Sequence, residues 1–143
     1  MSSPTERGAH TVPVSHTVLV FSQDPAVREQ IRTAVGRRPA GDVGRIEYVD
    51  VGTGDEVMSY VDAGGVDLAI LDGEAQPTGG MGIVRTIRQE VADPPLLLVL
   101  IRRRDDRWLA TWSQADGTIM YPVDAVTAAE TVSGLLRKRA GVR

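Results

Sequence analysis

The sequence contains no cysteine, and its two histidines, His10 and His16, both lie near the N-terminus. Disulfide bonds and thiolate metal sites are therefore excluded, and so is a histidine-based catalytic triad inside the domain. Only one of the 16 basic residues is a lysine, Lys138, so lysine chemistry is available at a single position. No pair of carboxylates with a catalytic spacing can be identified. These absences argue against an independent enzyme.

Long apolar runs and an excess of positive charge are missing as well. No run approaches the roughly 18 apolar residues of a membrane span, and no signal peptide is visible. The net charge of -3 gives no reason to expect nucleic acid or an anionic membrane as a partner. We expect a cytoplasmic protein with a flexible polar tail at residues 1–16 and one domain at residues 17–143.

The pattern centres on a short apolar run, residues 66–71, that ends in Asp72. Glycines precede and follow it. A short apolar run with such boundaries is typical of a strand buried on both faces of a parallel sheet. Functional side chains of open α/β sheets lie beyond the carboxyl ends of the strands. Asp72 therefore occupies the place of a functional carboxylate. The alternative is that it only opens the following turn.

The rest of the chain alternates between strand and helix patterns. Helix start signals are Asp24-Pro25 and the capping box of Thr53 and Glu56. Strict alternation predicts an α/β fold: a doubly wound, five-stranded parallel sheet of flavodoxin-like order 2-1-3-4-5, with helices on both faces. The predicted strands are 17–21, 46–51, 66–72, 96–101 and 117–123. In this order the first and third strands are neighbours, so Ser22, Gln23, Asp24 and Asp72 would line one crevice.

These elements resemble the receiver domain of two-component response regulators over residues 17 to about 140. The resemblance rests on residues 18–28, residues 67–72, Pro77 with Gly79-Gly80, and Tyr121-Pro122. In the family, a histidine kinase phosphorylates the aspartate that matches Asp72. Two acidic residues after the first strand hold magnesium. A Ser or Thr after the fourth strand and a Lys before a proline after the fifth contact the phosphoryl group.

The sequence departs from this pattern at most of those positions. Ser22 and Gln23 match the acidic pair, Ile101 matches the Ser or Thr, and Tyr121 matches the Lys. Asp24, one position further on, is acidic but is also explained as a helix cap. With Asp24 and Asp72 as the metal candidates, magnesium would bind weakly, and we expect no required cofactor.

The resemblance further implies a cis peptide bond before Pro122 and places the phenol of Tyr121 within reach of Asp72. The first hypothesis is therefore an atypical, stand-alone receiver of actinobacterial type, a pseudo-receiver with a degraded pocket and no DNA-binding output. It would act by binding a protein, such as a histidine kinase or a regulated complex.

The family's usual contact face is the fourth helix, fifth strand and fifth helix, which corresponds here to residues 102–112 and 124–139. A homodimer could form through the same face. Arg107, Trp108 and Trp112 are its interface candidates, because Trp and Arg are favoured anchors. The alternative is that the tryptophans belong to the core and the arginines are solvated.

Two other functions stay open. Asp72 could be a working but weak phosphoacceptor. Alternatively, the chain could be a doubly wound domain that binds a small molecule or nucleotide, with Gly79-Gly80-Met81-Gly82 cradling an anion at a helix N-terminus. The second possibility has a weak signal, because neither the dinucleotide nor the phosphate-loop glycine spacing is present.

Overall fold

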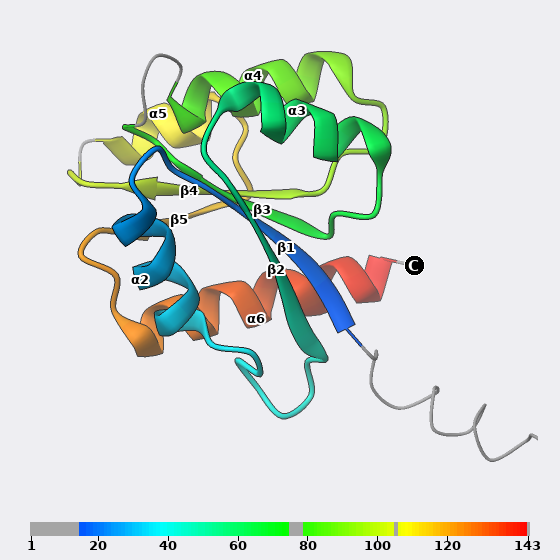
Figure 1. Ribbon diagram of the computed structural model, residues 1–143, viewed down its shortest axis with the longest axis vertical. Coiled ribbons are helices and arrows are strands. Elements are labelled where there is room, and N and C mark those ends of the chain that lie inside the picture. The colour runs from blue at the N-terminus through cyan, green and yellow to red at the C-terminus, as the bar shows by residue number, and fades with distance from the viewer. Residues whose placement is uncertain (1–14, 75–78, 105, 143) are drawn as a thin grey trace, which may run out of the picture.

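The computed structural model describes residues 15–74, 79–104 and 106–142. They form a five-stranded parallel sheet of order β2-β1-β3-β4-β5 (Figure 1), which confirms the predicted fold class. The central strands are apolar throughout because both of their faces are covered. The strands are β1 (Ser15–Phe21), β2 (Arg45–Val51), β3 (Leu68–Asp72), β4 (Leu96–Ile101) and β5 (Gly117–Met120).

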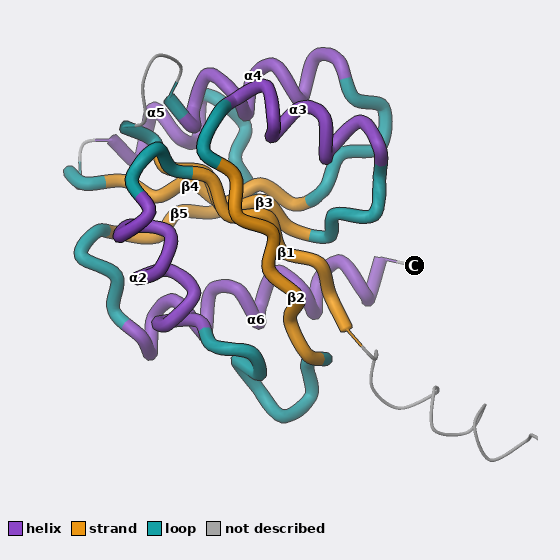
Figure 2. Tube along the Cα trace, in the orientation of Figure 1, coloured by secondary structure: helices purple, strands orange, loops and turns teal. Residues whose placement is uncertain are grey.

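Helices cover both faces of the sheet (Figure 2). On one face α3 and α4 pack over a core that includes Leu71 and Ile87. On the other face α2 and α6 pack over a second core that includes Ile31 and Val132. The helices are α2 (Pro25–Val35), α3 (Gly54–Ala63), α4 (Gly80–Glu90), α5 (Asp106–Trp112) and α6 (Ala125–Val142). Across the described residues, no helix is long and apolar enough to span a membrane.

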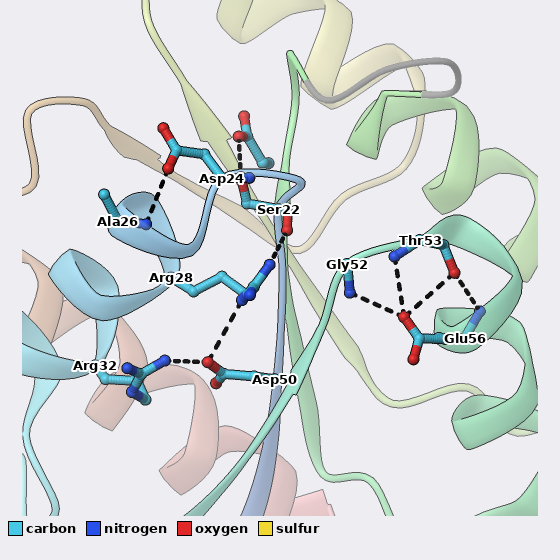
Figure 3. Close-up of polar contacts among 10 residues, drawn as sticks. Ser22, Asp24, Ala26, Arg28, Arg32, Asp50, Gly52, Thr53 and Glu56 are labelled. Carbon is cyan, nitrogen blue, oxygen red and sulfur yellow. Dashed lines mark hydrogen bonds and ion pairs between the residues drawn. The ribbon is translucent and has the colours of Figure 1, made fainter.

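The two predicted helix starts form as expected. Asp24 caps α2 by accepting a hydrogen bond from the backbone N–H of Ala26, and Pro25 begins the helix. Thr53 and Glu56 form a reciprocal capping box at the start of α3 (Figure 3). Each cap satisfies N–H groups that have no partner inside the helix.

Some boundaries differ from the predicted ones. Ser15 and His16, which the polar composition predicts to belong to the tail, begin β1 and pair with Arg45 and Ile46 of β2. Their side chains are polar and give no strand signal, because the strand forms here through backbone pairing with β2. At the other edge, β5 ends at Met120 rather than at residue 123, because Pro122 has no N–H to extend the ladder.

Candidate functional site

Asp72 ends β3 at the carboxyl edge of the sheet and is only 3% exposed. Ser22 follows β1, the neighbouring strand, and is 1% exposed. A buried carboxylate is costly unless hydrogen bonds or opposite charge compensate it. The partners of Asp72 therefore determine what this site can do.

Both carboxylate oxygens of Asp72 have partners within the chain. The Ser22 hydroxyl donates to Oδ2 at 2.8 Å, and the backbone N–H of Glu74 donates to Oδ1 at 3.0 Å. The Ser22 oxygen in turn accepts the backbone N–H of Asp24 at 3.1 Å. The structure thus brings Ser22 and Asp72 together in the crevice, and the hydroxyl links the loop after β1 to the end of β3.

Arg102, which sequence reasoning did not single out, supplies the positive charge of the site. Its Nη2 atom lies 3.6 Å from Oδ2 of Asp72, and its guanidinium carbon lies 4.3 Å from the ring centroid of Tyr121. It is the first residue after β4, at the same sheet edge as Asp72. That position was the available signal, but the sequence pattern placed residues 102–112 on the expected contact face, with solvated arginines as the alternative.

Tyr121 has a different role from the one expected. The bond between Tyr121 and Pro122 is cis, as the resemblance implied. Among the described residues, however, the Tyr121 phenol makes no hydrogen bond to Asp72, and its ring instead carries the Arg102 guanidinium. A cation over an aromatic face is a favourable contact, and it turns the tyrosine into a platform rather than a donor.

The other predicted pocket positions lie around this centre. The Asp24 carboxylate is used as the cap of α2 (Figure 3), and Gln23 is exposed in the same loop. Ile101 is buried in the core at 1% exposure, while the strand register places Leu100 opposite Asp72. Neither β4 residue has a hydroxyl. Pro77 lies outside the described residues.

The loop after β1 is held by a second arginine. Arg28 donates to the backbone carbonyl of Ser22 at 2.5 Å, and its Nε lies 3.4 Å from the Asp50 carboxylate (Figure 3). Arg32 also pairs with Asp50. These contacts fix the carbonyl side of Ser22 and so support the orientation of its hydroxyl toward Asp72.

Gly80 is explained by packing. A Cβ atom there would lie 2.9 Å from the backbone oxygens of both Leu71 and Asp72. The first turn of α4 therefore presses against the end of β3, which only glycine allows. This close approach accounts for the glycine at the first position of α4.

The groups around Asp72 offer few oxygen ligands for magnesium. No group of three or more His, Cys, Asp or Glu side chains that could hold a metal occurs in the part of the chain that the structure describes. Magnesium prefers six oxygens and usually one or two carboxylates. Here a serine hydroxyl, a backbone N–H and a guanidinium surround the one buried carboxylate, and two of these groups can only donate.

The predicted contact face is partly open to solvent. Trp108 on α5 is 65% exposed, so it does not belong to the core, and Arg107 beside it is exposed. Val126, in the first turn of α6, is 66% exposed. The Trp112 side chain lies outside the described residues. Large exposed apolar side chains near basic groups are typical of contact surfaces.

Two carboxylates near α6 have shifted proton affinities. Asp124 accepts the backbone N–H of Thr127 at 2.8 Å, and this bond lowers the pKa of the Asp124 carboxyl. The hydrogen bond from Arg137 lowers the pKa of Asp42. Both carboxylates are therefore favoured as anions in the folded chain.

Comparison with known proteins supports one family. Two uncharacterized response regulatory proteins of Mycobacterium tuberculosis, from two strains, are each 48% identical over 120 residues, which is 84% of this chain and 90% of theirs. No family model matches the chain.

Solved receiver structures share the fold. A receiver domain of a Francisella response regulator superposes with a TM-score of 0.71 at 16% identity, covering 86% of this chain and 98% of that one. The response regulator TrrA of Thermotoga maritima, in complex with magnesium and beryllofluoride, gives 0.69 at 24% identity over 84% and 98%.

Proposed function

The chain belongs to the response regulator family as a receiver domain, and from that premise we propose that it signals through protein contacts, with an Asp72 site neutralised by its own side chains. Receiver domains are signalling modules rather than typical enzymes. This receiver would reach its working state without magnesium or a phosphoryl group.

One observation carries the proposal. Both oxygens of the buried Asp72 carboxylate already accept hydrogen bonds, and Arg102 lies 3.6 Å from one of them. A conventional acceptor aspartate must instead offer an oxygen to a metal ion and to phosphorus. In this chain, attack on phosphorus through Oδ2 would compete with the bond from Ser22, and attack through Oδ1 with the bond from Glu74.

The chemistry of phosphoryl transfer supports the same view. The attacking carboxylate and the phosphoryl oxygens are all anionic, so the transition state needs cations and hydrogen-bond donors around it. Removing one such donor typically costs about 2.7–4 kcal/mol, a hundredfold to thousandfold in rate. Here the positions of the acidic pair, the hydroxyl residue and the lysine all carry other residues.

The partner face of the proposal is the surface of α5, β5 and α6. Exposed Trp108 and Arg107 on α5 would form the apolar and basic centre of a contact with a histidine kinase, a regulated complex or a second copy of the chain, and exposed Val126 would add apolar area on α6. Truncating a central tryptophan commonly costs 2 kcal/mol or more of binding free energy, roughly thirtyfold in affinity.

The test is the intact mass of the protein after incubation with acetyl phosphate and magnesium. We expect no phosphate adduct on the wild-type chain and none on Asp72→Asn, while a conventional receiver treated in parallel gains one. An adduct on wild type that Asp72→Asn lacks would contradict the proposal and make Asp72 a working, weak phosphoacceptor.

The contact mode has its own measurement. Sedimentation of the wild-type chain detects dimers, and Trp108→Ala should weaken any dimer or any complex with a cognate kinase. The exposed Tyr60 on α3 offers a matched control, because α3 is not part of the α5–β5–α6 surface and Tyr60→Ala removes an aromatic side chain outside it. Equal effects of the two substitutions would argue against the α5–β5–α6 surface.

A further inference from the structure

We infer that Arg102 is the resident cation of the Asp72 site, held in place by the ring of Tyr121, and that it competes with a divalent cation for the same carboxylate. This inference rests on the proposed function, because it gives the physical reason for a magnesium-independent site. Tyr121 positions the guanidinium, and Arg102 excludes the divalent cation from the carboxylate.

The ion pair is asymmetric in its exposure. The Asp72 side chain is 4% exposed and that of Arg102 is 31% exposed, with Nη2 and Oδ2 separated by 3.6 Å. Exposed ion pairs contribute little because water and salt screen them. With the carboxylate buried, screening is weaker, and the guanidinium is the only cationic side chain paired with it among the described residues.

Tyr121 positions the guanidinium. Its ring centroid lies 4.3 Å from the guanidinium carbon, within the range of a cation–π contact. Arg102 Nε is buried and has no hydrogen-bond partner among the described residues, so the ring and the Asp72 carboxylate are the contacts that position this guanidinium. A planar guanidinium can stack and pair at the same time, which an ammonium cannot.

Strand register explains why these two residues meet. Ile101 of β4 pairs with Met120 of β5, and the backbone N–H of Tyr121 donates to the carbonyl of Ile101 at 2.8 Å. Arg102 and Tyr121 directly follow the ends of these neighbouring strands. The cation of the site therefore comes from the end of β4, while the position that resembles the family lysine supplies the ring beneath it.

This geometry has a consequence for metal binding. A divalent cation that binds Oδ2 must displace the guanidinium or bear its repulsion, because both are positive. The repulsion between two cations is weakly screened beside a buried carboxylate. Removing the charge at residue 102 should therefore strengthen magnesium binding by about tenfold, which corresponds to about 1.4 kcal/mol.

The experiment is isothermal titration of magnesium chloride into the full chain and four variants. Arg102→Met removes the charge but keeps an unbranched apolar stem against Tyr121. Arg102→Lys keeps the charge. Arg104→Met is the matched control, because it removes an equal charge from an exposed position in the same run. Arg102→Met combined with Asp72→Asn tests whether the gained affinity depends on the carboxylate.

We expect weak magnesium binding by wild type, Arg102→Lys and Arg104→Met, and about tenfold tighter binding by Arg102→Met that disappears in the combined variant. Equal affinity of Arg102→Met and Arg104→Met would overturn the inference and leave the proposed function standing. A phosphate adduct on the wild-type chain would instead overturn the proposed function, so the two failures are distinguishable.

A second measurement uses the wild-type fold. The Nε–H proton of Arg102 should resonate upfield of a free arginine because of the Tyr121 ring, and it should move in Asp72→Asn. A resonance at the position of a free arginine, unchanged by Asp72→Asn, would also overturn the inference. This result does not depend on whether Arg102→Met folds.

Discussion

Replacing Ser22 by alanine removes the hydroxyl that compensates the buried carboxylate of Asp72. Ser22 is 1% exposed and Asp72 is 3% exposed, so water cannot replace the lost donor without a rearrangement of the loop. The bond is 2.8 Å long and has a charged acceptor. The backbone N–H of Asp24 also loses the acceptor that it had in the serine oxygen.

The magnitude follows from the type of bond. A hydrogen bond to a charged group contributes about 1.5–3 kcal/mol, so Ser22→Ala should lower the free energy of unfolding by that amount. For a chain of this size, the corresponding fall in melting temperature is roughly 5–15 °C. With asparagine at position 72 the acceptor is neutral, and the cost of Ser22→Ala should shrink to about 0.5–1.5 kcal/mol.

The assay is urea unfolding at pH 7, followed by circular dichroism, for the two single variants and the double variant. Ser133→Ala is the matched control, because Ser133 is 2% exposed and its hydroxyl has no hydrogen-bond partner among the described residues. We expect Ser133→Ala to be neutral or stabilising. A Ser22→Ala cost no larger than that of Ser133→Ala, or one that Asp72→Asn leaves unchanged, would refute the hydrogen-bond account.

Three further predictions concern other parts of the fold. Burial raises the pKa of Tyr48 above its ordinary value of 10.0, so an absorbance titration should show a tyrosine ionisation well above pH 10 that is lost in Tyr48→Phe. Because the unfolded chain then loses this proton first, stability should fall as pH rises past 10. The hydrogen bond to Asp124 lowers its pKa from 3.8, so its contribution to stability should be complete above that pH and lost as pH falls through the folded value. Comparing Asp124→Ala with wild type at pH 7 and pH 2 checks the direction, since the difference in stability should be smaller in acid. Gly80→Ala places a Cβ atom 2.9 Å from two backbone oxygens and should cost about 1–3 kcal/mol in urea unfolding. Gly134→Ala in α6 meets nothing within 4 Å and should instead stabilise by about 0.5–1 kcal/mol.

The local signals of the sequence predicted the local structure well. Apolar runs of strand length, together with Asp24-Pro25 and the Thr53 capping box, indicated the strands and helices and their alternation. Alternation leads to a parallel sheet because each crossover must carry a helix. Asp72 could be located for the same reason, since it ends the central apolar run and every parallel strand ends at the functional edge.

Orientation could not be predicted in the same way. The spacing of Trp108 with its neighbours fits a helix but does not tell which side of a short helix faces the sheet, and the structure leaves Trp108 65% exposed. Ser15 and His16 resemble tail residues in sequence, because backbone pairing with β2 does not require any particular type of side chain.

The sequence by itself determined the alternation of strands and helices, the helix starts and the place of Asp72, because these follow from periodicity, capping and chain direction. Only the tertiary structure decided the partners of that carboxylate. Arg102 and Tyr121 are 19 positions apart in the sequence. Arg102 follows β4 in a run of charged residues, and Tyr121 follows β5. They meet because β4 and β5 pair in one register, which aligns the ends of the two strands and sets a guanidinium between a ring and Asp72.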